Sequence, residues 1–320
     1  MRAFEANSGA IERECARIWT AVPAPQQIRP KSDRLLVPVQ RTYRVNGTGL
    51  GLRRTHMGPL QDHTPEEIAF FEVAPENWLG VGGRLGEAFE RISAQRPLLC
   101  HGLLLNLGGP DPLDLAFIAR LKGFLDAHQV LIYGDHLSYC AAGGQLYELL
   151  PMPFTAEAVL HVAARIREVQ ERLERRIAIE NPSYYLCLSN ELDEVSFIKA
   201  VLAEADCDLL IDINNIYVNS VNHGYDPRAF LASLPAERIA YAHIAGHSQD
   251  SDGLVIDTHG TPVIESVWGL LEFAYQRFGV VPTLLERDEN IPPLDEVLAE
   301  VRRIVALQQH CAAHSGGMAA

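Results

Sequence analysis

Short apolar segments alternate with longer amphipathic segments along most of this 320-residue chain, and this alternation constrains the fold more than any other feature. Short apolar runs are typical of buried strands, whereas apolar residues that recur every three or four positions are typical of helices. Strands in regular alternation with helices indicate repeated β-α units and a parallel sheet. The apolar runs predict eight strands, which are Gly49–Arg53, Phe70–Ala74, Pro97–His101, Val130–Tyr133, Arg176–Glu180, Leu209–Ile213, Ile239–Ile244 and Thr283–Glu286.

The amphipathic segments predict helices that separate or follow these strands, notably Asp114–Ala127, Thr155–Leu173, Glu194–Ala205, Glu265–Phe278 and Pro293–Leu307. Thr155 precedes a helical run and is expected to be its N-cap. Eight β-α units in a chain of this length predict a single (β/α)8 TIM barrel. An open doubly wound sheet has the same alternation, but no glycine-rich phosphate loop follows the first strand, and this favours the barrel.

The barrel domain is expected to occupy residues 46–308. Residues 1–45 are interpreted as an N-terminal extension, in which a short helix from Ile11 to Trp19 leads into the proline-rich linker AVPAPQQIRPKS. Residues 309–320 are interpreted as a flexible tail whose two histidines, His310 and His314, are exposed.

Composition excludes several classes of partner. The chain has 41 acidic and 27 basic residues, a formal net charge of −14, so a nucleic acid is a poor partner. The sequence contains no apolar run of the roughly 18 residues that a membrane span needs, and its N-terminus has no apolar signal core. The six cysteines show no CxxC spacing and suit buried free thiols in a reducing compartment. We therefore expect a cytoplasmic protein.

Polar residues gather where the predicted strands end. In a barrel, the carboxyl ends of the strands form the active-site face. The polar residues at or just beyond these ends are His101, Asp135, His136, Glu180, Asp212, Asn215, His243, His247, Asp257, His259, Glu286 and Asp288. Imidazole and carboxylate groups at this density suit a borderline divalent metal such as zinc or iron.

Each of these residues has an ordinary explanation when it is taken alone. A single histidine at a strand end is commonly a hydrogen-bonded structural residue, Glu180 could cap a loop, and Asp212 could cap a helix. Together they favour metal ions, because several carboxylates buried around one axis without cations are strongly destabilising or become protonated. The candidates outnumber the ligands of a single catalytic ion, so we expect two or three ions, with Glu180 as a bridging ligand.

Ten ordered motifs between residue 49 and about residue 294 carry a family resemblance. They are GLGLRRTH, EVAPENWLGVGG, CHGLLLNLGG, GDHLSY, LLPMPFT, IENPSYYL, LLIDINNIYVNSVNHGYDP, HIAGH, IDTHGTPV and ERDENIPPL. On these motifs the chain resembles the multinuclear non-haem iron-dependent oxidases, a bacterial family that includes the iron subunit of the methanobactin oxazolone-forming enzyme and the thiaglutamate-pathway oxidase.

The resemblance implies a xylose-isomerase-like TIM barrel that holds two or three iron ions (Fe2+/Fe3+) and uses O2 as co-substrate. It implies an oxidase or oxygenase of RiPP biosynthesis, which modifies cysteine residues of a ribosomally synthesised peptide. The implied partners are a Cys-containing precursor peptide and a separately encoded protein that binds the leader of this precursor, in a heterodimer with the oxidase.

The resemblance also implies the metal ligands, in an order similar to that of the three-zinc barrel of endonuclease IV. They are His101, Asp135, His136, Glu180, Asp212, Asn215, His243, Asp257, His259 and Glu286. Asn215 stands where that nuclease has histidine, and Asp135 stands where the oxidase family usually has glutamate.

Within this ligand set, His243 is expected to share one ion with Asp212 and Glu286, while Asp257 shares another with His259. His247 and Asp288 lie just outside the set and are expected to orient ligands or move protons. Ordinary loop hydrogen bonding is the alternative role for these two residues.

Two other functions compete with the oxidase. The first is a metal-dependent hydrolase or isomerase on the same barrel, similar to endonuclease IV or xylose isomerase. The charge of −14 argues against DNA as its substrate, and the lack of a lysine near the strand ends argues against sugar isomerisation. The second is a non-enzymatic metal-binding scaffold, for which a barrel with open ligand positions is an unusual design.

Overall fold

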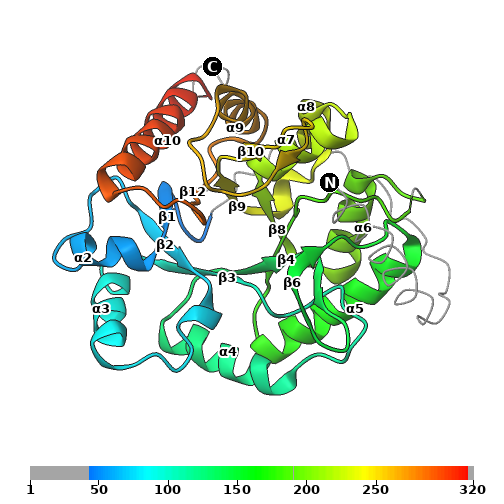
Figure 1. Ribbon diagram of the computed structural model, residues 1–320, viewed down its shortest axis with the longest axis horizontal. Helices are drawn as coiled ribbons and strands as arrows, with labels where there is room; N and C mark the ends of the chain where they lie inside the picture. The colour runs from blue at the N-terminus through cyan, green and yellow to red at the C-terminus, as the bar shows by residue number, and fades with distance from the viewer. Residues whose placement is uncertain (1–42, 190, 316–320) are drawn as a thin grey trace.

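The computed structural model describes residues 43–189 and 191–315, which form a closed barrel of eight parallel strands surrounded by helices (Figure 1). The barrel strands are β1 (Thr48–Gly51), β2 (Phe70–Val73), β3 (Leu98–Gly102), β4 (Tyr133–His136), β7 (Ala178–Glu180), β8 (Asp208–Asp212), β9 (Ile239–Ile244) and β12 (Thr283–Leu285). Their order around the ring follows the chain, and β12 closes the ring by pairing with β1. The predicted (β/α)8 TIM barrel is confirmed.

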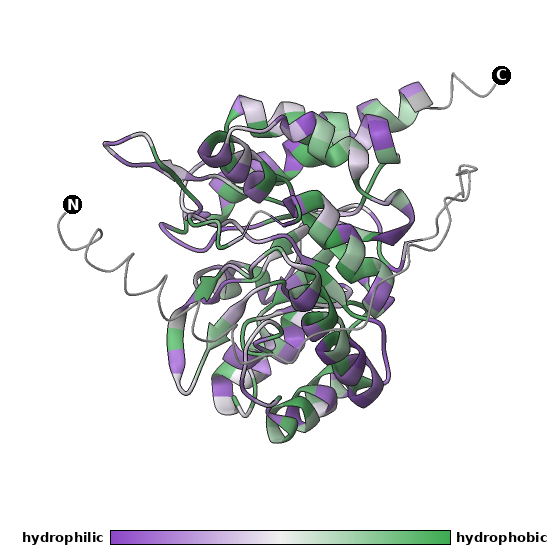
Figure 2. Cartoon of the chain, turned by 90° about the vertical axis from the view of Figure 1, so that its right-hand side faces the viewer, coloured by the Kyte–Doolittle hydropathy of each residue, from purple (hydrophilic) through white to green (hydrophobic). Residues whose placement is uncertain are grey.

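Helices cover the outside of this barrel. The longer ones are α3 (Gly83–Ser93), α4 (Leu115–Ala127), α5 (Ala156–Leu173), α6 (Glu194–Ala205), α7 (Ile213–His223), α8 (Pro227–Ser233), α9 (Glu265–Phe278) and α10 (Leu294–Ser315). Short helical turns are α2 (Met57–Leu60), η1 (Arg54–His56), η2 (Pro75–Asn77) and η3 (Ala236–Arg238). Hydrophobic and hydrophilic residues alternate along the helical ribbons in Figure 2, as expected of amphipathic helices that pack on a barrel. None of the described helices combines the length and apolar character that crossing a membrane requires.

The sequence predictions of helix starts agree with the structure to within one residue for α4, α5, α6 and α9. Thr155 caps α5 as predicted, because its side chain accepts a hydrogen bond from the Ala158 amide at 3.1 Å. The predicted end of the last helix is wrong: α10 continues past Leu307 to Ser315, so residues 309–315 of the expected tail are helical. His310 and His314 are exposed on it. Residues 1–42 of the expected extension, with its helix, and residues 316–320 lie outside the described residues.

The fourth strand lies farther along the chain than its apolar run indicates. The run Val130–Tyr133 predicts the strand, whereas β4 spans Tyr133–His136. The apolar run marks burial, and its backbone already bonds to β3 through the Leu131 amide and the Leu98 carbonyl at 3.0 Å. Pairing then continues through the polar residues, since His136 is in register with Glu180 of β7. A search for apolar runs therefore does not detect the polar end of a strand.

Two small hairpins sit beside the barrel, and the sequence analysis missed both. β5 (Tyr139–Ala141) pairs with β6 (Gln145–Leu150) after β4, and β10 (Ser248–Gln249) pairs with β11 (Val255–Ile256) after β9. The second hairpin leads directly into the loop that carries Asp257 and His259. Its short strands are below the length at which period-two alternation is a usable signal.

The interior of the barrel is filled by one apolar layer. Seven of the eight barrel strands, or the residue just before them, contribute to it, with Phe70, Leu99, Ile132, Ala178, Leu210, Tyr241 and Leu284. Side chains two positions apart on a strand point to the same face. The next interior position on six of these strands is therefore a polar residue: Glu72, His101, Glu180, Asp212, His243 and Glu286. The apolar layer thus forms the floor beneath a layer of ionisable groups.

Candidate metal centre

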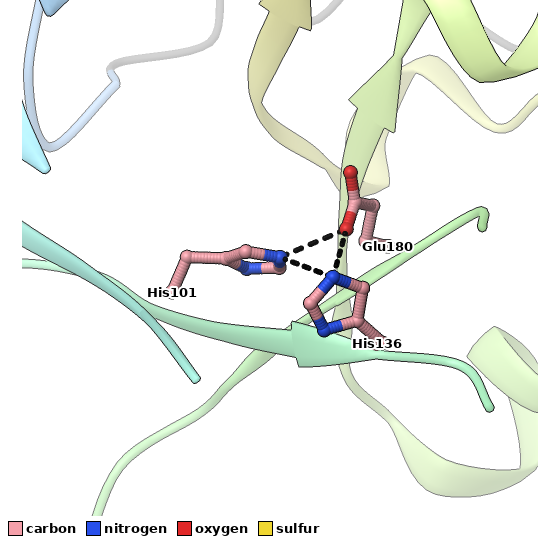
Figure 3. A group of neighbouring side chains, drawn as sticks. All are labelled: His101, His136 and Glu180. Carbon is pink, nitrogen blue, oxygen red and sulfur yellow. Dashed lines mark hydrogen bonds and ion pairs between the residues drawn. The ribbon is translucent and has the colours of Figure 1, made fainter. Parts of the chain in front are cut away.

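His101, His136 and Glu180 form the first of several buried groups in this ionisable layer (Figure 3). The Glu180 Oε2 atom lies 2.8 Å from His101 Nε2 and 3.2 Å from His136 Nε2, and the two Nε2 atoms lie 3.1 Å apart. His136 Nδ1 contacts the Gly102 carbonyl oxygen at 3.0 Å. This contact places a proton on Nδ1, so the Nε2 lone pair of His136 faces the group.

Protonation of this group is strongly perturbed. Burial disfavours the charged form of His101, but Glu180 outweighs it and raises the His101 pKa to about 9. Burial and the neighbouring His101 lower the pKa of His136 to about 4. Burial opposes ionisation of Glu180, yet the two histidines hold its pKa well below the usual range. The group therefore carries an ionised carboxylate and one neutral imidazole, and a cation can replace the proton on the other imidazole.

His243 stands at the centre of the second group. Its Nδ1 atom lies 3.0 Å from Glu286 Oε2, 3.5 Å from Glu180 Oε1 and 3.9 Å from Asp212 Oδ2. His243 and Asp212 are fully buried. Glu180 thus offers one oxygen to each of the first two groups, as expected of a bridging ligand. Asp212 and Glu286 both lie near His243 Nδ1, with Glu180 closer than Asp212, and the sharing of one ion by His243, Asp212 and Glu286 stays a prediction.

His259 forms the third group with Asp212 and Glu286. Its Nδ1 atom lies 3.3 Å from Glu286 Oε2, and its Nε2 atom lies 3.9 Å from Asp212 Oδ2. Asp257 Oδ1 lies 2.7 Å from the same Nε2 atom, so the expected pairing of Asp257 with His259 is present. His259 has a φ of +47°, a left-handed backbone conformation that is uncommon for residues other than glycine.

The three groups overlap, because Glu180, Asp212 and Glu286 each belong to more than one possible set of ligands. Several buried polar atoms in this region form no aligned hydrogen bond to the described residues. They are His101 Nδ1, Asp212 Oδ2, Asn215 Oδ1 and both ring nitrogens of His243 and His259. Buried polar atoms without partners are costly unless a ligand satisfies them. The donor set of imidazoles and carboxylates thus fits a multinuclear metal site.

Asp212 and Asn215 are held by the start of α7. Asp212 Oδ1 accepts a hydrogen bond from the Asn215 amide at 2.6 Å, which makes Asp212 the N-cap of this helix. The structural and metal-binding roles of Asp212 are therefore compatible, because they use different oxygens. Asn215 Nδ2 donates to the Asn181 carbonyl at 3.2 Å, which leaves Asn215 Oδ1 as the atom available to a metal. Asn181 also pairs with the Asp212 backbone through two hydrogen bonds.

Asp135 is the one candidate ligand that the structure turns away from these groups. Ile132 and His136 face the barrel interior, so the side chain of Asp135 points to the opposite face of β4. Its Oδ2 accepts a hydrogen bond from the Tyr133 hydroxyl at 2.7 Å, and its Oδ1 accepts the His136 amide at 2.8 Å. Burial, together with Glu76, raises the pKa of Asp135 to about 7. A ligand role for Asp135 stays a prediction that requires this side chain to rotate.

His247 and Asp288 lie at the margin of the centre. His247 Nδ1 contacts Asn214 Oδ1 at 2.7 Å, and Asn214 in turn donates to Asp257 at 2.8 Å. His247 is thus linked to the metal groups through one intervening side chain. Asp288 Oδ2 lies 3.3 Å from His259 Nδ1, while its other oxygen pairs with Arg53. Asp288 is 46% exposed, so its carboxylate reaches solvent at the edge of the centre.

Two residues that the sequence analysis missed belong to the centre. Glu72 of β2 is 4% exposed and lies within reach of His243 and Glu286. Arg53 donates to Glu286 at 3.2 Å and pairs with Asp288, so it fixes the outer oxygen of Glu286. The period-two pattern after Phe70 could have indicated Glu72, but an acidic residue inside the run FFEVA does not look like a strand end. Arg53 ends the predicted strand Gly49–Arg53, so its position could have indicated it, but a guanidinium is not a metal ligand and falls outside a pattern of ligands.

A cavity of about 430 Å³ opens above the metal groups. His101, Glu180, Asn215 and His259 lie on its floor or walls, and Leu103, Leu149 and Tyr185 are exposed hydrophobic residues in its lining. The described residues also enclose a larger cavity of about 480 Å³, between the loop before α6 and helices α6 and α8. That cavity contains none of the metal groups, so its size says nothing about the chemistry.

The sequence as a whole matches a known family. A model of the RiPP precursor modification enzymes MbnB/TglH/ChrH, which act on ribosomally synthesised and post-translationally modified peptides, matches residues 47–309. The chain belongs to this family. Relatives of high identity are the UPF0276 proteins of Pseudomonas aeruginosa PAO1, 52% identical over 85% of this chain and 95% of that one, and of Nitrosospira multiformis, 50% identical over 85% and 97%. A UPF0276 protein of Shewanella sediminis is 52% identical over 80% and 92%.

Solved structures support the fold assignment of this family member. A xylose isomerase domain protein from Planctomyces limnophilus superposes with a TM-score of 0.55, at 10% identity over 85% of this chain and 99% of that chain. A xylose isomerase-like TIM barrel protein from Mycobacterium smegmatis, in complex with magnesium, has a TM-score of 0.51 at 11% identity over 81% and 87%. At such identities the likeness concerns the fold alone, and it confirms the expected xylose-isomerase-like barrel.

Proposed function

We propose that this protein is a multinuclear iron-dependent oxidase that uses O2 to modify cysteine residues of a ribosomally synthesised peptide. The observation that carries the proposal is the overlap of four possible ligand groups through Glu180, Asp212, His243 and Glu286 at the floor of an open cavity. Membership in a family of RiPP precursor modification enzymes supports a peptide as the substrate. Shared carboxylates favour two or three ions, because a single ion needs only about three protein ligands.

The residues that would hold the ions are His101, His136, Glu180, Asp212, Asn215, His243, Asp257, His259 and Glu286, with Asp135 added if its side chain turns. Bound iron would supply the redox chemistry by which a cysteine residue of the peptide loses electrons and O2 gains them. The chain itself supplies orientation, since the Gly102 carbonyl fixes one tautomer of His136 and Arg53 holds Glu286. Asp288 and His247 are the groups placed to move or position protons beside His259 and Asp257.

The cavity mouth suits an extended peptide. Leu103, Leu104, Leu149 and Tyr185 are exposed on loops at the carboxyl ends of the strands, next to the metal groups. Exposed apolar side chains around an active-site cavity are typical of a binding surface for another chain. We propose a Cys-containing precursor peptide as the substrate, delivered by a separately encoded partner protein that binds its leader segment.

The test measures metal content and O2 consumption together. The protein is purified without oxygen, loaded with Fe2+, and mixed with O2 and a Cys-bearing precursor peptide encoded beside its gene, with the neighbouring partner protein present. We expect two or three irons per chain, O2 uptake that depends on the peptide, and a peptide mass that changes after the reaction. A protein that holds only zinc or magnesium and stays inert to O2 with this peptide contradicts the oxidase. In that case a hydrolase or isomerase becomes the better explanation of the site.

Single substitutions test the ligand set. His243→Ala and Asp257→Ala are expected to lower the iron content per chain, because each removes one metal ligand. The protein should stay folded and soluble, since the rest of the barrel is unchanged. His310→Ala, at an exposed position on α10, is the control and retains the full iron content. Metal analysis by mass spectrometry reads the result. Unchanged iron content in both site variants removes His243 and Asp257 from the ligand set.

A further inference from the structure

Glu72 is a buried carboxylate beside the metal groups for which neither the ligand set nor the proposed chemistry has a use. It lies in the interior layer of β2 and is 4% exposed. Its Oε1 atom lies 2.9 Å from Nε2 of His243, and its Oε2 atom accepts a hydrogen bond from the Tyr241 hydroxyl. Both oxygens therefore already face protein donors, one from a tyrosine and one from a histidine of the same strand.

The two nitrogens of His243 face different surroundings. Nε2 faces Glu72, whereas Nδ1 faces oxygens of Glu286, Glu180 and Asp212 at 3.0, 3.5 and 3.9 Å. A neutral imidazole has one N–H and one lone pair, and the partner of the N–H decides which nitrogen is free to bind a metal. Three carboxylates face Nδ1, and each of them also belongs to another of the metal groups. A single carboxylate, that of Glu72, faces Nε2.

We propose that Glu72 is a positioning residue that holds the proton of His243 on Nε2 and thereby leaves Nδ1 to bind the ion shared with Glu180, Asp212 and Glu286. The proposal rests on the metal centre proposed above. Carboxylates that accept the second N–H of a ligating histidine fix its tautomer and ring orientation and increase its basicity. In the present geometry the Nε2–H is not aligned with Oε1 although the two heavy atoms lie 2.9 Å apart, and hydrogen bonds at such sites commonly align only when the ligand is bound.

The Tyr241 hydroxyl completes this arrangement. Tyr241 is fully buried, and its hydroxyl donates to Oε2 of Glu72 while Oε1 of the same carboxylate faces His243. The rings of Tyr241 and His243 also meet edge to face, with centroids 5.4 Å apart. Tyr241 contacts Glu72 through its hydroxyl and His243 through its ring, so we expect its influence on a metal to pass through these two residues. The alternative is that Glu72 binds an ion directly, together with His243 and Glu286.

The experiment titrates Co2+ into metal-free protein without oxygen, using the visible absorption of bound cobalt and the total number of ions bound. The variants are Glu72→Gln, Tyr241→Phe, the double variant, and His243→Ala. We expect Glu72→Gln to weaken one cobalt site by roughly 10- to 100-fold while still filling it at high Co2+, since a glutamine oxygen can accept the Nε2–H. Tyr241→Phe weakens the same site less, and the double variant matches Glu72→Gln. His243→Ala loses this ion at all concentrations.

A second measurement reports the tautomer directly. Cobalt shifts the resonances of its histidine ligands, so the Nε2–H of His243 gives a shifted proton signal in H2O that is absent in D2O. We expect this signal in the wild-type protein, its loss in His243→Ala, and its broadening by solvent exchange in Glu72→Gln. Such a signature separates an effect on the His243 proton from a loss of packing.

A matched control is present elsewhere in the chain. Glu194 is a buried carboxylate that accepts a hydrogen bond from the Tyr184 hydroxyl at 3.2 Å, outside the metal groups. Glu194→Gln and Tyr184→Phe repeat the chemical changes made at Glu72 and Tyr241, and we expect both to leave cobalt affinity unchanged. A weaker cobalt site in these controls shows a general loss of packing and overturns the specific role of Glu72.

The outcomes separate this proposal from the proposed function. Wild-type cobalt affinity with an unchanged proton signal in Glu72→Gln overturns the positioning role. Loss of the ion in Glu72→Gln at every concentration, as in His243→Ala, makes Glu72 a ligand and also overturns it. Wild-type protein that binds no cobalt overturns the metal centre and the role of Glu72 together. Wild-type protein that binds metal but consumes no O2 contradicts the oxidase alone.

Discussion

At the scale of single residues, Asp212 shows how one side chain serves both the fold and the candidate site. Its Oδ1 caps α7 through the Asn215 amide, and its Oδ2 remains buried without an aligned partner among the metal groups. From sequence, helix capping and metal binding are competing explanations of an aspartate at a strand end. In the structure Asp212 can do both, because β8 ends at this residue and the same residue is the N-cap of α7.

Substitutions at Asp212 can separate these two roles. Asp212→Asn keeps a capping oxygen but loses the charge, whereas Asp212→Ala loses both. We expect both variants to bind less metal, and Asp212→Ala alone to lose about 1 kcal/mol of stability in the metal-free protein. Denaturant unfolding with a chelator present and metal analysis give the two readouts. Asp193→Ala removes the cap of α6, which accepts the Ser196 amide at 2.7 Å, and should lose stability without losing metal. Equal stability of the two Asp212 variants contradicts the capping role.

Glu194 provides a prediction of pH dependence away from the metal groups. Burial raises its pKa to about 7, against the opposing hydrogen bonds from Tyr184, Tyr225 and Asn219. The folded protein thus keeps a proton on Glu194 that the unfolded chain releases near pH 4.5. The free energy of unfolding therefore decreases as the pH rises from about 4.5 to 7. Glu194→Gln cannot titrate. We expect wild-type stability, measured relative to this variant by denaturant unfolding, to fall by about 3 kcal/mol between pH 4.5 and 7.5. A constant difference contradicts the prediction.

At the scale of elements, the candidate site is the second interior layer of the barrel strands. Residues such as Leu99 and Tyr241 fill the first layer, and the residues two positions later, His101 and His243, form the second. The period of two in a strand therefore decides which strand-end residues can meet. It also accounts for Asp135, which is adjacent to His136 and consequently points to the other face of β4.

Close packing between neighbouring strands gives a prediction at this scale. A Cβ atom on Gly102, at the end of β3, would collide with the Tyr133 hydroxyl and the Asp135 carboxylate. We expect Gly102→Ala to destabilise the protein by about 1 to 3 kcal/mol and to weaken metal binding at His101 and His136, because the buried side chains of Tyr133 and Asp135 must move from their places beside His136. Gly123→Ala is the matched control, since nothing lies within 4 Å of the added Cβ on exposed α4. It should be neutral or stabilising by up to about 1 kcal/mol. Similar unfolding midpoints in both variants contradict this assignment.

At the scale of the whole molecule, barrel closure gathers carboxylates from distant parts of the chain. Glu72, Glu180, Asp212 and Glu286 come from four strands and are all buried near one axis. Burial opposes the ionisation of Glu180, Asp212 and Glu286, and it raises the pKa of Asp212 to about 7. Bound cations would offset the repulsion and the lost hydration together. Folding and metal binding should accordingly be linked.

Metal removal is the corresponding prediction. A ligand that binds the native state alone stabilises it by about 2.7 kcal/mol at 100 times its Kd, which amounts to roughly 5 to 10 °C in Tm for a domain of this size. We expect a chelator to lower the Tm by at least this amount at pH 7, and added Fe2+ under anaerobic conditions to restore it. The triple variant His101→Ala, His243→Ala, His259→Ala should show no response to either treatment. A wild-type Tm that is insensitive to chelator and metal contradicts the linkage.

The sequence by itself determined the barrel and most of the candidate ligands. The eight strands and the polar residues beyond them are readable because apolar runs, helical periods and strand ends are local patterns. His101, Glu180, Asp212, His243 and Glu286 follow from position alone, since the carboxyl ends of parallel barrel strands share one face.

Only the tertiary structure decided how these residues associate. It placed Glu72 beside His243, turned Asp135 away, and divided the oxygens of Glu180 between two groups and those of Asp212 between the α7 cap and the metal groups. The phase of each strand's pleat and the pairing of β12 with β1 set these relationships, and both are properties of the closed barrel. Side chains far apart in sequence meet because of the stagger between strands, which no local pattern of residues encodes.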